Sequence, residues 1–181
     1  MLEDKLLIRR YNRGEAAVLH RIYDKYKKDL MTLATALLFD KTDAEDLVHD
    51  LFTALIRSCG ERQIRVNLKG YLLSSTANRA RNRNQAGQIR TTASLDQAES
   101  AASHGKGPVA TGLLGEQRQQ MDEALGRITY EQREVLFLHR RNRMTFKAIA
   151  ETLGLSINTI QGRYRYGLAK LRSLLNGEVE K

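Results

Sequence analysis

The chain has 181 residues, no tryptophan and a single proline, and hydrophobic residues make up 41% of it. This is enough for one ordinary domain or two small ones, with cores of Leu, Ile, Val and Ala and with helix favoured over strand. The net charge of +9 favours a polyanionic partner, although charge alone puts nucleic acid only slightly ahead of a protein that is simply basic.

Several classes of protein are disfavoured by what the sequence lacks. Cys59 is the only cysteine, so neither an intrachain disulfide nor a multi-cysteine zinc site can form. The histidines form no close-spaced ligand pair, and no nucleophile–base set or phosphate loop occurs, so we expect no metal, cofactor, small-molecule substrate or catalysis. There is no apolar signal stretch, and the longest apolar run, residues 33–39, is too short to span a bilayer. An intracellular, cytoplasmic protein without membrane insertion is predicted.

Three helices are predicted in the first half of the chain. Apolar residues recur at helical spacing over residues 15–39, with Lys25 and Lys28 among the residues that turn outward. Residues 42–45 resemble a capping box, in which Thr42 begins a second helix. A third helix is predicted from about Leu68 to Arg83, after a short segment at residues 60–67.

The composition changes between residues 85 and 116. This segment is rich in Ala, Ser, Gly, Thr and Gln, contains Pro108 and shows no sustained periodicity, which is typical of a flexible linker. The sequence therefore predicts an all-α protein of two small domains. Residues 1–84 form a domain of three or four helices, residues 85–116 form the linker, and residues 117–181 form a four-helix domain.

The C-terminal domain contains the sequence pattern of a helix-turn-helix. Thr129 and Gln132 form a capping box, Thr145 caps a short helix that ends at Gly154, and Ser156 caps the last helix. A short helix, a turn containing glycine and a second helix are the elements of this DNA-binding unit.

The last predicted helix has two different faces. We expect the apolar face to turn inward; it consists of Ile157, Ile160, Tyr164, Leu168, Leu171 and Leu175. The opposite face is polar and basic and lacks acidic residues, as suits base reading and phosphate contact in the major groove. Gly162 costs about 1 kcal/mol relative to Ala in mid-helix, which a close approach to DNA would explain. A plain solvated helix is the alternative, and the preceding helix–turn unit favours DNA.

The second and third helices differ in the charge of their outer faces. On the third, Tyr71, Asn78 and Asn82 share a narrow arc in a basic neighbourhood, which suits stacking and hydrogen bonding to unpaired bases. A solvated basic helix explains this face equally well. The outer face of the second helix is acidic, with Asp43, Glu45, Asp46 and Asp50, and a basic protein partner is the sharper hypothesis. The usual preference for acids at helix N-termini explains the first three as well.

Three segments, in order, resemble parts of the sigma-70 family of RNA polymerase sigma factors. Residues 42–58, TDAEDLVHDLFTALIRS, resemble the helix that binds core polymerase, and residues 69–84, KGYLLSSTANRARNRN, resemble the helix that melts and recognises the −10 element. Residues 128–174, which include FKAIAETLGLSINTIQGRYRYGLAKLRSLL, resemble the region that binds the −35 element. The order of these parts without an intervening domain is similar to the extracytoplasmic-function (ECF) group.

The resemblance implies roles for the matching positions. Contact with core polymerase is implied for Asp46, Leu47, His49 and Asp50. Handling of the melted −10 strand is implied for Asn67, Lys69, Tyr71, Asn78 and Arg79, to which the shared helix face adds Asn82. Contact with the −35 duplex is implied for Asn158, Thr159, Gln161, Gly162, Arg163 and Arg165, and Tyr166 lies on the same face.

This sequence departs from the family pattern at several of these positions. Tyr71 stands where many relatives have Trp, and His49 replaces a common Gln. Gln161 and Gly162 occupy positions often filled by Lys or Arg and by Ser, and Tyr166 stands where Arg is common. The promoter sequence therefore cannot be carried over from relatives.

The function implied is that of a sigma factor that directs core RNA polymerase to promoter DNA, duplex and single-stranded. An anti-sigma protein stays open as a further partner. A stand-alone helix-turn-helix regulator is the second hypothesis, but it leaves the Tyr71, Asn78 and Asn82 face unexplained. A third is a protein-interaction module that sequesters a regulator, for which the basic faces would be incidental.

Overall fold

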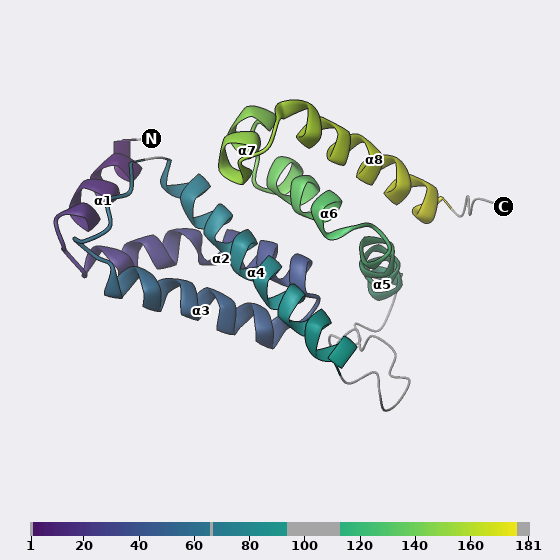
Figure 1. Cartoon of the computed structure of the whole chain (residues 1–181), viewed down its shortest axis with the longest axis horizontal. Coiled ribbons are helices and arrows are strands. Elements are labelled where there is room, and N and C mark those ends of the chain that lie inside the picture. Colours follow the sequence, from purple (N-terminus) through teal and green to yellow (C-terminus); the bar gives the residue numbers. More distant parts are fainter. Residues whose placement is uncertain (1, 66, 94–112, 177–181) are drawn as a thin grey trace. The chain divides into compact units, whose positions relative to one another are not determined.

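The computed structural model describes residues 2–65, 67–93 and 113–176, and the regular structure in these ranges is all helical. The all-α prediction is confirmed. Contacts within the chain define two compact units, one N-terminal and one C-terminal (Figure 1). No helix in the described ranges is long and apolar enough to cross a membrane.

The N-terminal unit contains four helices, α1 (Leu2–Asn12), α2 (Val18–Leu38), α3 (Lys41–Arg57) and α4 (Leu68–Ala93). α2 packs against α3 and α4, and α1 lies at one end of the unit against α2 and α4 (Figure 1). Leu30, Leu33, Leu47, Leu72 and Leu73 are almost wholly buried between these helices. Burial of this apolar surface is the main stabilising contribution to the unit.

α1 was not predicted from the sequence. Its apolar pattern is short, because only Leu7 and Tyr11, four residues apart, are buried. Glu3 and Asp4 in its first turn both bind Lys25 Nζ of α2, at 2.5 Å and 2.8 Å, and Tyr26 donates to Asp4 Oδ1 at 2.6 Å. A helix of 11 residues is marginal in isolation, so these contacts hold it in place.

We expect the attachment of α1 to weaken in acid. Burial raises the pKa of Asp4, but hydrogen bonds from Lys25 and Tyr26 outweigh it, so this pKa lies below its ordinary value. A lowered pKa in the folded state adds stability that is present above about pH 4 and is lost as the pH falls further. Urea unfolding at pH 6 and pH 3 should show a smaller acid loss in Asp4→Asn than in the wild type. Equal losses would show that Asp4 is not the group responsible.

The predicted cap of the second helix is wrong. α3 begins at Lys41, and Asp40 caps it, because its side chain accepts a hydrogen bond from the Asp43 N–H at 2.8 Å. Thr42 lies inside the first turn and is exposed. Aspartate and threonine are both good N-cap residues. The left-handed backbone of Phe39 (φ 58°) ends α2, and Asp40 directly after it takes the extended conformation that an N-cap needs.

Substitution of Asp40 and of Thr42 shows which of the two residues caps α3. Asp40→Ala should lower the free energy of unfolding by about 1 kcal/mol, because the Asp43 N–H loses its partner. Thr42→Ala should change it by no more than about 0.5 kcal/mol, because alanine is the better helix former at an exposed position. Urea unfolding followed by circular dichroism measures both. A larger loss for Thr42→Ala would restore the predicted capping box.

α4 continues well past the predicted end at Arg83. It runs to Ala93, and α5 begins at Leu113, so the predicted linker at residues 85–116 is helical at both ends. The flexibility predicted for residues 94–112 falls outside the described residues. Arg83 and Asn84 anchor the extension, because Arg83 binds Asp50 Oδ2 at 2.6 Å and Asn84 donates to Leu37 O at 3.1 Å. The first contact joins residues that are 33 positions apart in the sequence, and the second joins residues that are 47 positions apart. Composition cannot reveal such contacts.

The C-terminal unit contains α5 (Leu113–Gly126), α6 (Tyr130–Leu136), α7 (Phe146–Leu153) and α8 (Ile157–Leu175). α6 continues into a π-helical turn, η1 (Phe137–Arg141), and packs against α8. The predicted capping box of Thr129 and Gln132 is confirmed, and so are the caps at Thr145 and Ser156. Gly154 ends α7 with φ 66°, as predicted.

The buried stripe of α8 differs from the predicted one. Ile160 and Gly167 are buried, whereas Ile157 and Leu175 at the two ends are 42% and 41% exposed. The closest crossing with α6 lies at Gly167, where an added Cβ would stand 2.9 Å from Gln132 Cβ. The absence of a side chain there lets the two helices approach, and Ile160 is buried two turns before that crossing.

Candidate nucleic-acid interface

The outer face of α8 is the candidate site for duplex DNA in the C-terminal unit. Five of the predicted duplex-reading residues are exposed: Asn158, Thr159, Gln161, Arg165 and Tyr166. Gly162 and Arg163 are half-buried, and a Cβ at Gly162 would meet nothing within 4 Å. The backbone at Gly162 is therefore open to close approach from outside. Polar, basic and acid-free, this face matches the donors and acceptors of a major groove.

Two of these side chains are held in place by their neighbours. The Arg165 guanidinium lies 5.0 Å from the ring centre of Tyr166, a cation–π contact that restricts the arginine. Thr159 lies beside the cap of α8, with its Oγ1 2.8 Å from Ser156 Oγ. Thr159 therefore supports the start of the helix as well as standing on its outer face.

Three rings from different elements fix the position of α8. His139 of η1 stacks on Phe146 of α7 at 4.2 Å, and Tyr164 of α8 meets both edge-on at 4.9 Å and 5.2 Å. His139 Nδ1 lies 2.8 Å from Met144 O, and because a carbonyl only accepts, Nδ1 carries the proton. The predicted inward orientation of Tyr164 agrees with this cluster, but His139 and Phe146 were not predicted to be part of it.

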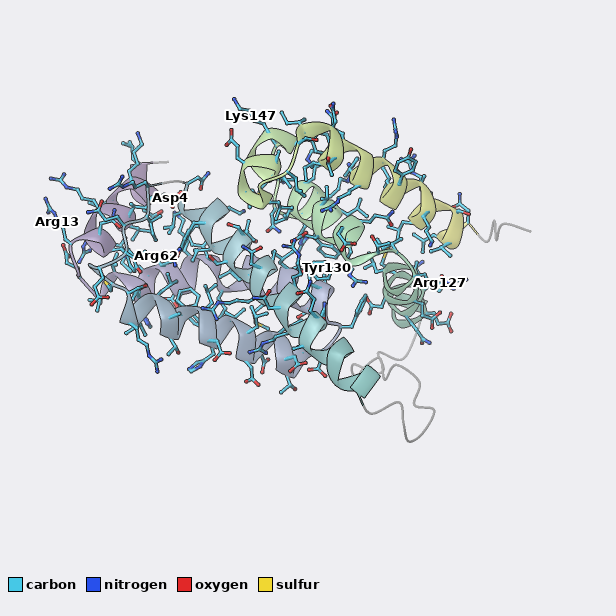
Figure 2. All side chains as sticks on the ribbon, viewed as in Figure 1. Asp4, Arg13, Arg62, Arg127, Tyr130 and Lys147 are labelled. Atoms are coloured by element: carbon cyan, nitrogen blue, oxygen red, sulfur yellow. The ribbon has the colours of Figure 1, made fainter. Side chains whose placement is uncertain are left out.

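The end of η1 and the loop between η1 and α7 add basic residues that were not predicted from the sequence. Arg140, Arg141 and Arg143 are exposed and make no ion pair with the described residues, and Arg143 has a left-handed backbone (φ 57°). Lys147, in the first turn of α7, points away from the unit (Figure 2). The signal was the run HRRNR at residues 139–143, which contains no acid. In helix-turn-helix proteins the first helix crosses the DNA backbone, so this loop suits phosphate contact.

One arginine of the same unit is buried and forms a hydrogen bond with a neighbouring helix. Arg133 of α6 is 6% exposed, and its Nη1 donates to Leu125 O at 2.8 Å. Burial lowers the pKa of Arg133 to about 10. This arginine therefore ties α6 to the end of α5 and is not a candidate for contact with DNA.

The polar face of α4 is confirmed in part. Leu72, Leu73, Thr76 and Ala80 are fully buried on one side of α4, and Asn78 and Asn82 are exposed on the other. Tyr71 is half-buried, and so are Lys69 and Arg79.

Two of the residues predicted to handle the −10 strand also have structural partners. Asn67 Oδ1 caps α4, accepting from the Lys69 N–H at 3.0 Å and the Gly70 N–H at 3.4 Å. Lys69 Nζ lies 2.7 Å from Asp29 Oδ2 of α2. Contact of Lys69 with a phosphate would have to compete with this ion pair, which is partly solvated and therefore weak.

The acidic face of α3 is exposed as predicted, with one exception. Asp46, His49 and Asp50 are exposed, but Leu47 is 0% exposed and belongs to the core of the unit. The structure therefore gives Leu47 a packing role and no surface for a partner. Arg83 of α4 lies 2.6 Å from Asp50 Oδ2 and 3.9 Å from Asp43 Oδ1, and Lys41 lies 3.8 Å from Glu45 Oε1. Three of the four acids of this face therefore already have ion pairs within the unit.

No group of three or more His, Cys, Asp or Glu side chains in the described ranges could hold a metal ion. The fold and these faces define an all-α DNA-binding protein of two units, one with a helix-turn-helix and one with a basic face beside an acidic face.

The comparisons with known proteins agree with this class. The model of sigma-70 region 2 matches residues 22–88, and that of sigma-70 region 4 matches residues 118–171. No curated protein sequence matches the chain. The chain belongs to the sigma-70 family, and the predicted resemblance to that family is confirmed. α1 lies outside both matched ranges.

Two solved structures share the fold. The sigma factor RpoE from Bartonella quintana, in complex with the anti-sigma factor NepR, is 22% identical with a TM-score of 0.72, and the match covers 90% of this chain and 98% of that one. CnrH, in complex with the cytosolic domain of CnrY, is 21% identical with a TM-score of 0.69, covering 97% of this chain and 99% of that one.

Proposed function

We propose that this protein is an ECF-type sigma factor that directs core RNA polymerase to its promoters. The outer face of α8 is the observation that carries the proposal, because it is basic, acid-free and presented by a helix-turn-helix. α8 would read the −35 duplex, with Arg140, Arg141 and Arg143 holding its phosphates. No chemistry is assigned to the chain itself, since bond formation belongs to the polymerase.

The N-terminal unit would bind both polymerase and melted DNA. Asp46 and His49 on α3 offer an exposed surface to a basic partner, and Asn78 and Asn82 on α4 suit the edges of unpaired bases. The two faces belong to adjacent helices joined by the Arg83–Asp50 ion pair. Residues 85–116 would join the unit that melts the −10 element to the unit that reads the −35 element.

The proposed function implies where the protein acts and which kind of protein regulates it. A protein that binds polymerase and chromosomal DNA acts in the cytoplasm, where both are found. One of the solved structures that share the fold is a sigma factor bound by an anti-sigma factor. We therefore propose an anti-sigma protein as a further partner of this chain.

Transcription in vitro tests the proposal directly. The purified chain is added to core RNA polymerase on fragments of its own genome, and 5′ ends of transcripts are mapped. Discrete start sites that depend on the chain are expected, and their absence on every fragment would exclude the function. A stand-alone regulator is not favoured, and it would differ by failing to co-purify with core polymerase in stoichiometric amounts.

A further inference from the structure

Tyr166 on the outer face of α8 is the only tyrosine or phenylalanine in the described parts of the chain whose side chain is exposed, at 61%. An exposed ring leaves apolar carbon in contact with water, and such rings are concentrated where proteins bind their partners. This ring belongs to the face that is proposed to read the −35 duplex. Its partner there is therefore a group in the major groove of that DNA.

The helix backbone next to this ring is open. Gly162 lies one turn before Tyr166, and a Cβ built at Gly162 would meet nothing within 4 Å. Helical side chains lean toward the N-terminus of their helix, so the Tyr166 side chain leans toward the turn that contains Gly162. Asn158, one turn earlier still, is also exposed. The bare backbone at Gly162 lets DNA come close enough for the ring to reach the edge of a base pair.

Arg165 limits the movement of the ring. Its guanidinium carbon lies 5.0 Å from the centre of the Tyr166 ring, and its Nη2 lies 3.5 Å from the Tyr166 hydroxyl oxygen. This contact restricts both side chains, which lowers the entropy cost of placing the ring in the groove. α8 contains no Asp or Glu, so no acid of this helix competes with the ring for Arg165.

The chemistry of the ring restricts which base it can select. Tyrosine has one hydroxyl, so it cannot form the paired hydrogen bonds with which arginine selects guanine. The C5-methyl of thymine is the apolar group that the base edges present in the major groove, and aromatic side chains contact it. The other three bases carry no methyl group there. The ring therefore matches thymine.

We propose that Tyr166 is a specificity-determining residue that selects thymine at one base pair of the −35 element. Its ring packs on the C5-methyl, Gly162 gives room for this approach, and Arg165 keeps the ring in place. The inference rests on the proposed function and adds to it the identity of one base. It also predicts a difference from relatives that have arginine at this position, because arginine there would select guanine.

Removal of the thymine methyl tests the proposal. The full chain is assembled on core polymerase, and fluorescence anisotropy at fixed salt measures binding to a promoter duplex found by transcript mapping. Each thymidine of the −35 element, on either strand, is replaced in turn by deoxyuridine. At one position the wild type should bind about fourfold more weakly, as expected for the loss of about one buried methyl group. At that position Tyr166→Ser should bind the two duplexes equally.

Matched variants separate the ring from other contributions. Tyr166→Phe keeps the ring and should keep the fourfold preference. Lys170→Ala removes a charge from an exposed position one turn later and should weaken binding to both duplexes by the same factor. Tyr166→Arg should change the preferred base at this pair from thymine to guanine. Serine and tyrosine have similar helix propensities, so Tyr166→Ser should keep the fold, which thermal unfolding checks.

The failure of this inference is distinguishable from that of the proposed function. If deoxyuridine weakens wild-type binding at no position, or weakens the wild type and Tyr166→Ser equally, selection of thymine by Tyr166 is overturned. Loss of promoter binding by Arg163→Ala/Arg165→Ala in the same assay would show that α8 still reads the duplex. If that double variant also binds normally, α8 does not read the −35 element, and the inference falls with that part of the function.

Discussion

Gly167→Leu is expected to unfold the C-terminal unit or to lower its stability by about 3 kcal/mol or more. At this position a new Cβ alone would stand 2.9 Å from Gln132 Cβ and 3.2 Å from Leu136 Cδ1. The first of these atoms is close to the backbone of α6 and cannot swing away. The two helices would have to separate, which exposes the core between them.

Gly162→Ala is the matched control on the same helix. A Cβ there meets nothing within 4 Å, so the change should stabilise the unit by about 0.5–1 kcal/mol through helix propensity. Thermal unfolding of both variants gives the comparison. Similar stability for Gly167→Leu and the wild type would refute the close crossing of α6 and α8.

Gly162→Ala has a second use, because its effects on stability and on DNA binding should differ in sign. If the backbone at Gly162 approaches DNA closely, the variant is more stable and yet binds the −35 duplex more weakly. Undiminished binding would mean that the glycine is not needed for contact.

Arg163→Ala/Arg165→Ala is expected to weaken binding to the −35 duplex by about 2–6 kcal/mol, or about 30-fold and more. The estimate takes each arginine as one contact of about 1–3 kcal/mol with a base edge. Arg165 is already held against Tyr166, so little side-chain freedom is lost when it binds. Fluorescence anisotropy on a promoter found by transcription mapping, at fixed salt, measures the loss.

Arg172→Ala is the control for charge, since it lies on the exposed side of the last turn of α8. It should change affinity little. Arg165→Lys should bind between the wild type and the double variant, because an ammonium keeps the charge but cannot stack as a plane or donate a fork. Equal losses for Arg172→Ala and the double variant would show that the outer face contributes only general charge.

Local signals predicted much of the fold and of the duplex-binding face. The caps at Thr129, Thr145 and Ser156 and the left-handed Gly154 depend on residues no more than four positions apart, and they were placed correctly. The outer face of α8 follows from its period of 3.6 residues. The error at Asp40 shows the limit of such signals, because two neighbouring residues could each serve as cap.

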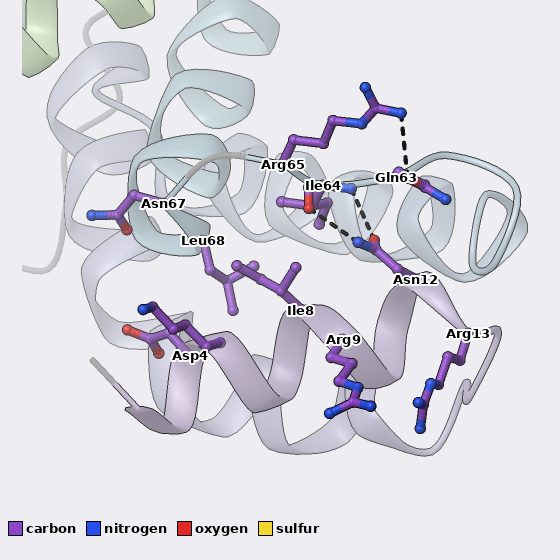
Figure 3. A pocket seen from close by; sticks show the side chains of 11 residues that line it. Asp4, Ile8, Arg9, Asn12, Arg13, Gln63, Ile64, Arg65, Asn67 and Leu68 are labelled. Carbon is purple, nitrogen blue, oxygen red and sulfur yellow. Dashed lines mark hydrogen bonds between the residues drawn. The ribbon is translucent and has the colours of Figure 1, made fainter.

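Other features depend on which helices become neighbours, and no local pattern contains that information. Leu47 has a residue type typical of a core position, but it also matches a position that contacts core polymerase in the family. Only the packing of α3 in its unit shows that Leu47 belongs to the core. Gly167 carries no local signal of its role, yet it is where α8 comes close to α6. The Asn12–Ile64 pair holds α1 against the segment before α4 and joins residues 52 positions apart (Figure 3).

The basic last helix illustrates both sides of this division. Spacing and residue type alone assigned it an apolar face, a basic face without acids and a preceding turn, because side-chain direction in a helix is set by position along the chain. The degree of exposure of Ile157, the close approach of α6 at Gly167 and the ring cluster that fixes α8 came only with the fold. Burial and orientation are properties of contacts between elements, and these contacts join residues that are distant in the sequence.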